Sequence, residues 1–71
     1  MADSVYKVIE LIGTSPESWE KAASNAINEA SKTLDDIRIA TVTEMDIQLA
    51  QGETAVYRTK VKVSLKYHGN K

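Results

Sequence analysis

An early segment, residues 5–19, joins a β-type run to a helix start, and it constrains the fold more than any other part of the chain. Val, Ile and Tyr dominate residues 5–12 and fit a pleated sheet, whereas Gly13 can adopt backbone angles that end a strand. Ser15 has the hydroxyl of a helix N-cap, and Pro16 needs no N–H at the first helical position. We therefore expect the strand to end at Gly13 and a helix to follow Ser15.

Apolar residues recur at helical spacing after this junction. Steps of three and four predict one amphipathic helix that ends near Leu34, because the acidic pair Asp35 and Asp36 disfavours a helix C-terminus. Most of the stripe is alanine, so the helix can approach a sheet closely. The stripe consists of Trp19, Ala22, Ala23, Ala26, Ile27, Ala30 and Leu34. For Trp19 this spacing indicates packing.

Two further strands follow the helix. Residues 37–49 are rich in Ile, Thr and Val, but both faces mix apolar and polar side chains, which suits a sheet whose second face is covered by another subunit or lines a cavity. Residues 57–67 alternate strictly between an apolar side and an Arg/Lys side. A hairpin turn at residues 51–54, with Gly52 at positive φ, joins the two strands.

This turn also predicts cross-strand charge pairs. With the turn centred near Gly52, Glu44 lies near Lys60 and Asp46 lies near Arg58. The resulting fold class is α+β: a β-α-β-β protomer with a three-stranded antiparallel sheet wrapped on one helix.

We interpret the 71 residues as a single domain, ordered over about 4–67 with a tail at 68–71. Without cysteine it has no disulfide framework and no thiolate metal cluster. One helix covers only one face of a sheet, so oligomerisation is the remaining source of stability.

Charge and motifs narrow the function. A net charge of −1 argues against a nucleic-acid or anionic-membrane partner. No apolar run reaches the roughly 20 residues of a membrane span, and the first residues are acidic, so we expect a cytoplasmic protein. The single histidine, His68, stands in the tail as an exposed residue, and no phosphate loop, zinc spacing or nucleophile elbow is present. We therefore expect a binding protein and not an enzyme.

The chain resembles the dodecin family over nearly its whole length. The resemblance is carried by Tyr6-Lys7-Val8-Ile9-Glu10-Leu11-Ile12-Gly13-Thr14-Ser15-Pro16, the Ala-rich helix, Asp36-Ile37-Arg38-Ile39, and Tyr57-Arg58-Thr59-Lys60-Val61-Lys62-Val63-Ser64-Leu65. It implies a hollow homododecamer that binds flavin (riboflavin, FMN or FAD) for storage or sequestration, with the ring stacked on a tryptophan and hydrogen-bonded by a glutamine.

The flavin site is altered in this chain. Ile39 stands where the family has its stacking tryptophan, and Arg58 stands where it has the pocket glutamine, so a permanent cation replaces a neutral amide. Asp46 and Ile47 replace an Arg-Gly pair found in many flavin-binding members. The candidate ligand-binding residues at these pocket positions are Ile39, Asp46, Gln48 and Arg58.

Three functions remain open. The chain binds a flavin or another flat heterocycle at the altered site, or it binds calcium, or it forms a ligand-free structural shell. Calcium is suggested because some dodecin-like proteins with a Thr-Ser-Pro-x-Ser-Trp helix start and an Asp-Asp-Ile-Arg segment, both present here, are associated with calcium rather than flavin. The candidate metal ligands are Asp35, Asp36, Glu44 and Asp46, which could converge only through symmetry. The alternative is that Glu44 and Asp46 simply pair with Lys60 and Arg58, while the other two carboxylates are solvated.

Overall fold

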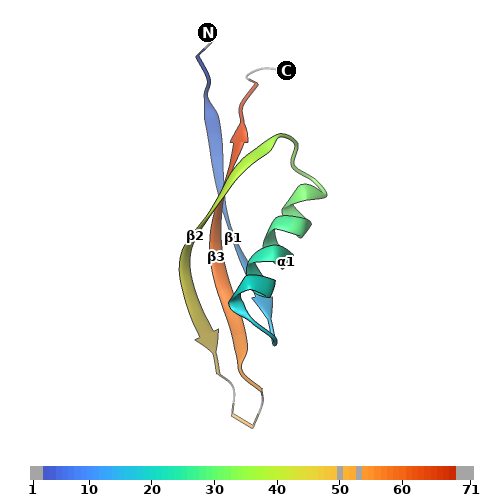
Figure 1. Cartoon of the computed structure of the whole chain (residues 1–71), viewed down its shortest axis with the longest axis vertical. Coiled ribbons are helices and arrows are strands. Elements are labelled where there is room, and N and C mark those ends of the chain that lie inside the picture. Colours follow the sequence, from blue (N-terminus) through green and yellow to red (C-terminus); the bar gives the residue numbers. More distant parts are fainter. Residues whose placement is uncertain (1–2, 50, 53, 69–71) are drawn as a thin grey trace.

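The computed structural model describes residues 3–49, 51–52 and 54–68. Its elements follow in the order β1 (Tyr6–Ser15), α1 (Trp19–Ser31), β2 (Ile37–Gln48) and β3 (Val56–Lys66). The three strands form one antiparallel sheet, and α1 lies on one side of it, beside β1 and β3 (Figure 1). The predicted α+β class and β-α-β-β order are confirmed.

The last strand in the sequence is the central strand of the sheet. The order is β1-β3-β2, so β3 pairs with both other strands. Its apolar side faces α1: Val61 and Val63 are completely buried, and Thr59 is 1% exposed. The strict alternation of β3 is explained by this position, because one face of a central strand must meet the helix while the other carries the Arg and Lys side chains.

The prediction that β1 ends at Gly13 is wrong. The strand continues through Gly13, which pairs with Thr59, to Ser15. Gly52, with a φ of +76°, takes the left-handed conformation instead. A Cβ atom at Gly13 would lie 2.0 Å from the carbonyl oxygen of Ala22 and 2.9 Å from the Cβ of Ala26. Gly13 is therefore needed for the close approach of α1, and not for a turn.

The helix begins three residues later than predicted. Ser18 is the N-cap, and its Oγ accepts a hydrogen bond from the Lys21 N–H at 3.0 Å. The Oγ of Ser15 accepts from the Glu17 N–H at 3.0 Å and so stabilises the turn between strand and helix. Ser15 is still paired with Tyr57 in the sheet, so it cannot also open the helix. The helix ends at Ser31, ahead of the predicted Leu34.

The core is small and the protomer is elongated. The apolar stripe of α1 buries Ala22, Ala26 and Ala30, as predicted. The molecule measures 54 × 20 × 16 Å, with a radius of gyration of 14.7 Å, whereas a compact domain of this length has about 11 Å. Its accessible surface is 5401 Å², against about 4,400 Å² for a compact monomer of 7.8 kDa. The excess surface favours assembly with other copies.

The structure also bears on membrane association. None of the helices in the described part of the chain is long and apolar enough to cross a bilayer.

Candidate functional site

The sheet face opposite α1 carries acidic and basic side chains from all three strands. β1 contributes Glu10 and Ile12 to it, and β2 contributes Glu44 and Asp46. These residues pair across the sheet with the cationic side of β3, which consists of Arg58, Lys60 and Lys62. We call these seven residues the charged face. It exists because every second residue of a strand points away from the helix.

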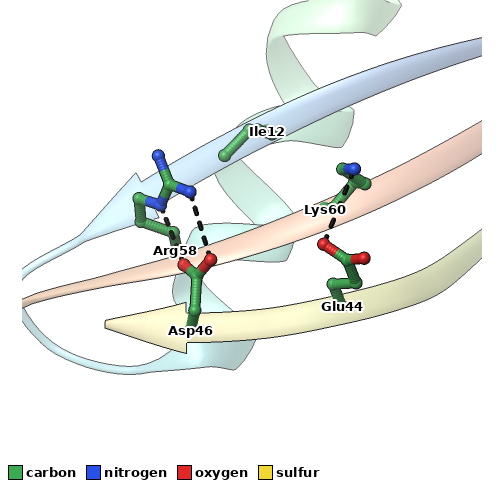
Figure 2. A pocket seen from close by; sticks show the side chains of 5 residues that line it. All are labelled: Ile12, Glu44, Asp46, Arg58 and Lys60. Carbon is green, nitrogen blue, oxygen red and sulfur yellow. Dashed lines mark hydrogen bonds and ion pairs between the residues drawn. The ribbon is translucent and has the colours of Figure 1, made fainter. Parts of the chain in front are cut away.

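Opposite charges on this face meet in pairs. Arg58 binds Asp46 through two contacts, Nε to Oδ1 at 2.8 Å and Nη2 to Oδ2 at 3.1 Å. The Nζ of Lys60 lies 3.5 Å from Oε1 of Glu44, one step along the same two strands (Figure 2). Both pairs were predicted from the turn at Gly52, and both are confirmed. The two-pronged geometry makes the Arg58–Asp46 pair the more specific of the two.

The ion pair changes the acidity of its members. The hydrogen bond from Arg58 lowers the pKa of the Asp46 carboxyl, and the positive charges of Arg58 and Lys60 lower it further. In return, the hydrogen bond with Asp46 raises the pKa of the Arg58 guanidinium. Both side chains are exposed, so solvent screens the pair. The pair therefore orders this part of the face more than it stabilises the fold.

Five side chains of the charged face enclose a small pocket. Figure 2 shows the apolar Ile12 on one side and the two ion pairs on the other. The pocket is lined by Ile12, Glu44, Asp46, Arg58 and Lys60. Its volume is about 90 Å³, whereas pockets for drug-sized ligands run from roughly 300 to 1,000 Å³. Within one protomer it has the size for an ion with a few water molecules and not for a flat heterocycle.

The structure separates the other predicted pocket positions. Asp46 and Arg58 are direct partners, whereas Ile39 pairs with Ser64, about 20 Å further along β3 at 3.3 Å per residue. Gln48 pairs with Val56 at the opposite end of β2. One protomer therefore joins Asp46 to Arg58 and leaves Ile39 remote from them.

The candidate metal ligands also fall into two groups. Asp35 and Asp36 precede β2, whereas Glu44 and Asp46 lie near its end, about 30 Å away along an extended strand. Within the described ranges no three His, Asp or Glu side chains gather in a way that could hold a metal ion. One protomer by itself therefore does not bring these four carboxylates together.

Asp36 has partners that the sequence did not reveal. Its Oδ2 lies 2.6 Å from Nε2 of His68, and its Oδ1 lies 3.9 Å from Nη2 of Arg38. The hydrogen bond with His68 lowers the pKa of the Asp36 carboxyl. The backbone of Asp36 is left-handed, with a φ of 60°, and its carbonyl accepts from the Lys66 N–H at 3.1 Å. His68 is exposed as expected, but it contacts Asp36, just before β2. The rest of the predicted tail, residues 69–71, lies outside the described residues.

Trp19 was predicted only to pack, and the structure gives it a polar role as well. Its Nε1–H donates a hydrogen bond to the backbone oxygen of Asp46 at 3.0 Å. Its ring meets Tyr57 edge to face, with centroids 4.9 Å apart and planes at 72°. The available signal was the indole N–H itself, because a half-buried tryptophan usually needs an acceptor.

Comparisons with known proteins agree with this geometry. The family model described as Dodecin matches residues 5–68. The chain is 51% identical over 63 residues to the calcium dodecin of Mycobacterium tuberculosis (strain ATCC 25618 / H37Rv), covering 89% of both chains.

Solved structures agree as well. A crystal structure of the M. tuberculosis protein, described as a calcium chelating antigen with a novel calcium-binding site, matches with a TM-score of 0.84 and 47% identity over 96% of this chain and 97% of that one. The dodecin of Streptomyces coelicolor matches with a TM-score of 0.86 and 31% identity over 96% and 97%. The chain therefore belongs to the dodecin family.

Proposed function

We propose that this chain is a binding protein and not an enzyme, that it assembles into a hollow homododecamer, and that the assembly stores or sequesters calcium. One observation carries the choice of calcium: the chain is 51% identical to a protein named calcium dodecin. Its four candidate carboxylates are also all exposed. They flank or belong to β2, which is exposed from Arg38 to Gln48.

The donor chemistry fits a hard cation. Calcium takes six to eight oxygen ligands, and carboxylates are among the ones it prefers. Glu44 and Asp46 stand two residues apart on one face of β2, so their side chains project side by side about 7 Å apart. Two carboxylates are too few for calcium, so we expect neighbouring copies to complete the coordination.

The surface of the protomer supports assembly. Val42, Met45 and Ile47 on β2 are 49%, 59% and 42% exposed. A stable interface buries about 800 Å² on each partner, and the excess surface of this protomer, about 1,000 Å², is of that order. Assembly would cover the apolar side of β2 and bring carboxylates of different copies together.

Calcium must compete with the cations of the charged face. Arg58 engages both carboxylate oxygens of Asp46, whereas Lys60 contacts Glu44 more loosely at 3.5 Å. Glu44 is therefore the more available ligand, and calcium binding at Asp46 requires Arg58 to move. We expect flavin to bind poorly, because the pocket beside Arg58 is small and Ile39 lies far from it.

Native mass spectrometry and thermal unfolding test the proposal. We expect a mass of twelve protomers, and a melting temperature that rises with calcium but much less with magnesium. At a calcium concentration one hundred times Kd the stabilisation is about 2.7 kcal/mol. The double variant Glu44→Gln with Asp46→Asn should reduce the rise. Glu29→Gln is the control, because Glu29 is an exposed carboxylate that also pairs with a lysine, Lys32, but lies on the helix.

Three outcomes contradict the proposal. A monomer or dimer in the mass spectrum contradicts the assembly. An unchanged melting temperature at millimolar calcium contradicts calcium as the ligand. Quenching of riboflavin fluorescence at micromolar protein restores flavin as the ligand.

A further inference from the structure

Trp19, the single tryptophan of the chain, is held on three sides at the start of α1. Its indole N–H donates to the oxygen of Asp46 at 3.0 Å, and its own carbonyl accepts from the Thr59 hydroxyl at 2.9 Å. Thr59 is almost completely buried, and the ring edge of Tyr57 completes the contact. The side chain therefore has a defined position between the helix and the end of β2.

β2 is held in the sheet from one side only, by its pairing with β3. It is an edge strand, it is exposed over residues 38–48, and its register with β3 shifts between Val42 and Glu44. Among the described residues, the bond from Trp19 to Asp46 is the only hydrogen bond between α1 and β2. This bond therefore joins the start of α1 to the last part of β2.

The indole and the charged pocket meet at the same residue. The backbone oxygen of Asp46 accepts from Trp19, while its carboxylate receives the two contacts from Arg58. A change in the position of the Asp46 backbone must move the carboxylate. In turn, a displacement of the carboxylate must change the surroundings of the indole N–H. The two bonds are therefore coupled through one amino acid.

We infer that Trp19 is a positioning residue of the charged pocket: its indole N–H fixes the backbone of β2 at Asp46, so that the Asp46 carboxylate faces Arg58. Where calcium is concerned, this inference rests on the proposed function. The positioning itself is a property of the protein without ligand, so it can be tested without calcium.

Two NMR signals report the coupling: the indole N–H of Trp19 and the Nε–H of Arg58. The indole N–H of the single tryptophan gives one signal, and Arg58→Met should shift it because the Asp46 carboxylate loses its partner. Lys62→Met is the matched control, since Lys62 lies on the same strand and face, outside the pocket, and pairs with Glu10 instead. We expect that variant to leave the indole signal in place.

The converse experiment removes the indole donor. Trp19→Phe keeps an aromatic ring and loses the N–H, and we expect the Nε–H of Arg58, identified by its loss in Arg58→Met, to exchange with water roughly two- to tenfold faster. Tyr57→Leu removes the ring contact and keeps the donor, so the Arg58 exchange should stay near that of the unaltered protein. A residue that only packed would give the opposite order for these two variants.

The outcomes separate the inference from the proposed function. An indole signal unmoved by Arg58→Met, or an Arg58 exchange rate unmoved by Trp19→Phe, overturns the inference. Calcium binding that calorimetry detects, that the double variant Glu44→Gln with Asp46→Asn abolishes, and that leaves the indole signal unchanged also overturns it. Both variant effects without any calcium binding leave the inference standing and overturn the proposed function.

Discussion

β2 and β3 are neighbours in one sheet and similar in length, yet they have opposite environments. β3 contributes the fully buried Val61 and Val63. β2 is exposed from its second residue to its last. Val42 and Val61 are direct cross-strand partners, but Val42 is 49% exposed and Val61 is 0% exposed.

The position of the helix explains the difference. α1 lies over β1 and β3, where Gly13 and the alanine stripe allow close contact, and it contacts β2 much less. β1, α1 and β3 therefore form the part that folds the protomer. The exposed side chains of β2 are free to contact other molecules. In our proposal these are other copies of the chain and calcium.

The largest effect is expected at the contact between β1 and α1. Gly13→Ala should destabilise the fold by about 3 kcal/mol, because the new Cβ would lie 2.0 Å from the backbone oxygen of Ala22 and the helix must move away. Gly52→Ala is the control: it meets nothing within 4 Å, and its left-handed φ of +76° costs about 1 kcal/mol. Urea unfolding measures both. If the two variants lose equal free energy of unfolding, the close approach of the helix does not explain why residue 13 is glycine.

The same substitution at paired positions compares the two strands directly. Val61→Ala should cost about 2 kcal/mol, because it removes two buried methyl groups and leaves a cavity. Val42→Ala should cost less than about 0.5 kcal/mol when the protein is dilute enough to dissociate. Its cost should grow with protein concentration where other copies cover β2. Denaturant unfolding over a range of protein concentrations gives both values; a Val42 cost as large as that of Val61 at every concentration would erase the distinction between the strands.

The smallest effect is expected from acid. The pKa values of Asp36 and Asp46 lie below the ordinary 3.8 in the folded protein, because His68 and Arg58 bond to their charged forms. The unfolded chain therefore binds protons first, so this stabilisation is present above about pH 4 and is lost as the pH falls through the folded values.

Asp46→Asn should reduce the decrease in unfolding free energy at low pH. Glu10→Gln, a control on the same face, should change this decrease less, because Lys62 contacts Glu10 only at 3.9 Å. The free energy of unfolding between pH 5 and pH 2 is the measurement. A slope that Asp46→Asn leaves unchanged would mean that the Arg58 pair contributes nothing to folding.

Part of the candidate site was accessible from the sequence. The turn at Gly52 sets the register of β2 against β3, so the pairs Asp46–Arg58 and Glu44–Lys60 followed from counting along one hairpin. The bonds of Asp46 to Trp19 and of Asp36 to His68 join residues 27 and 32 positions apart. No period or turn connects such residues, so only the folded chain could reveal these bonds.

The sequence by itself determined the elements and their faces: a strand of period two at residues 57–67, an alanine stripe of helical period, and the α+β class that they make together. These are local properties, since alternation and helical spacing depend only on near neighbours in the chain. The tertiary structure decided that β3 is central, that Gly13 serves the approach of α1, and that Trp19 binds the backbone beside the charged pocket. Each of these depends on how distant segments pack, and packing selects among arrangements that share the same local pattern.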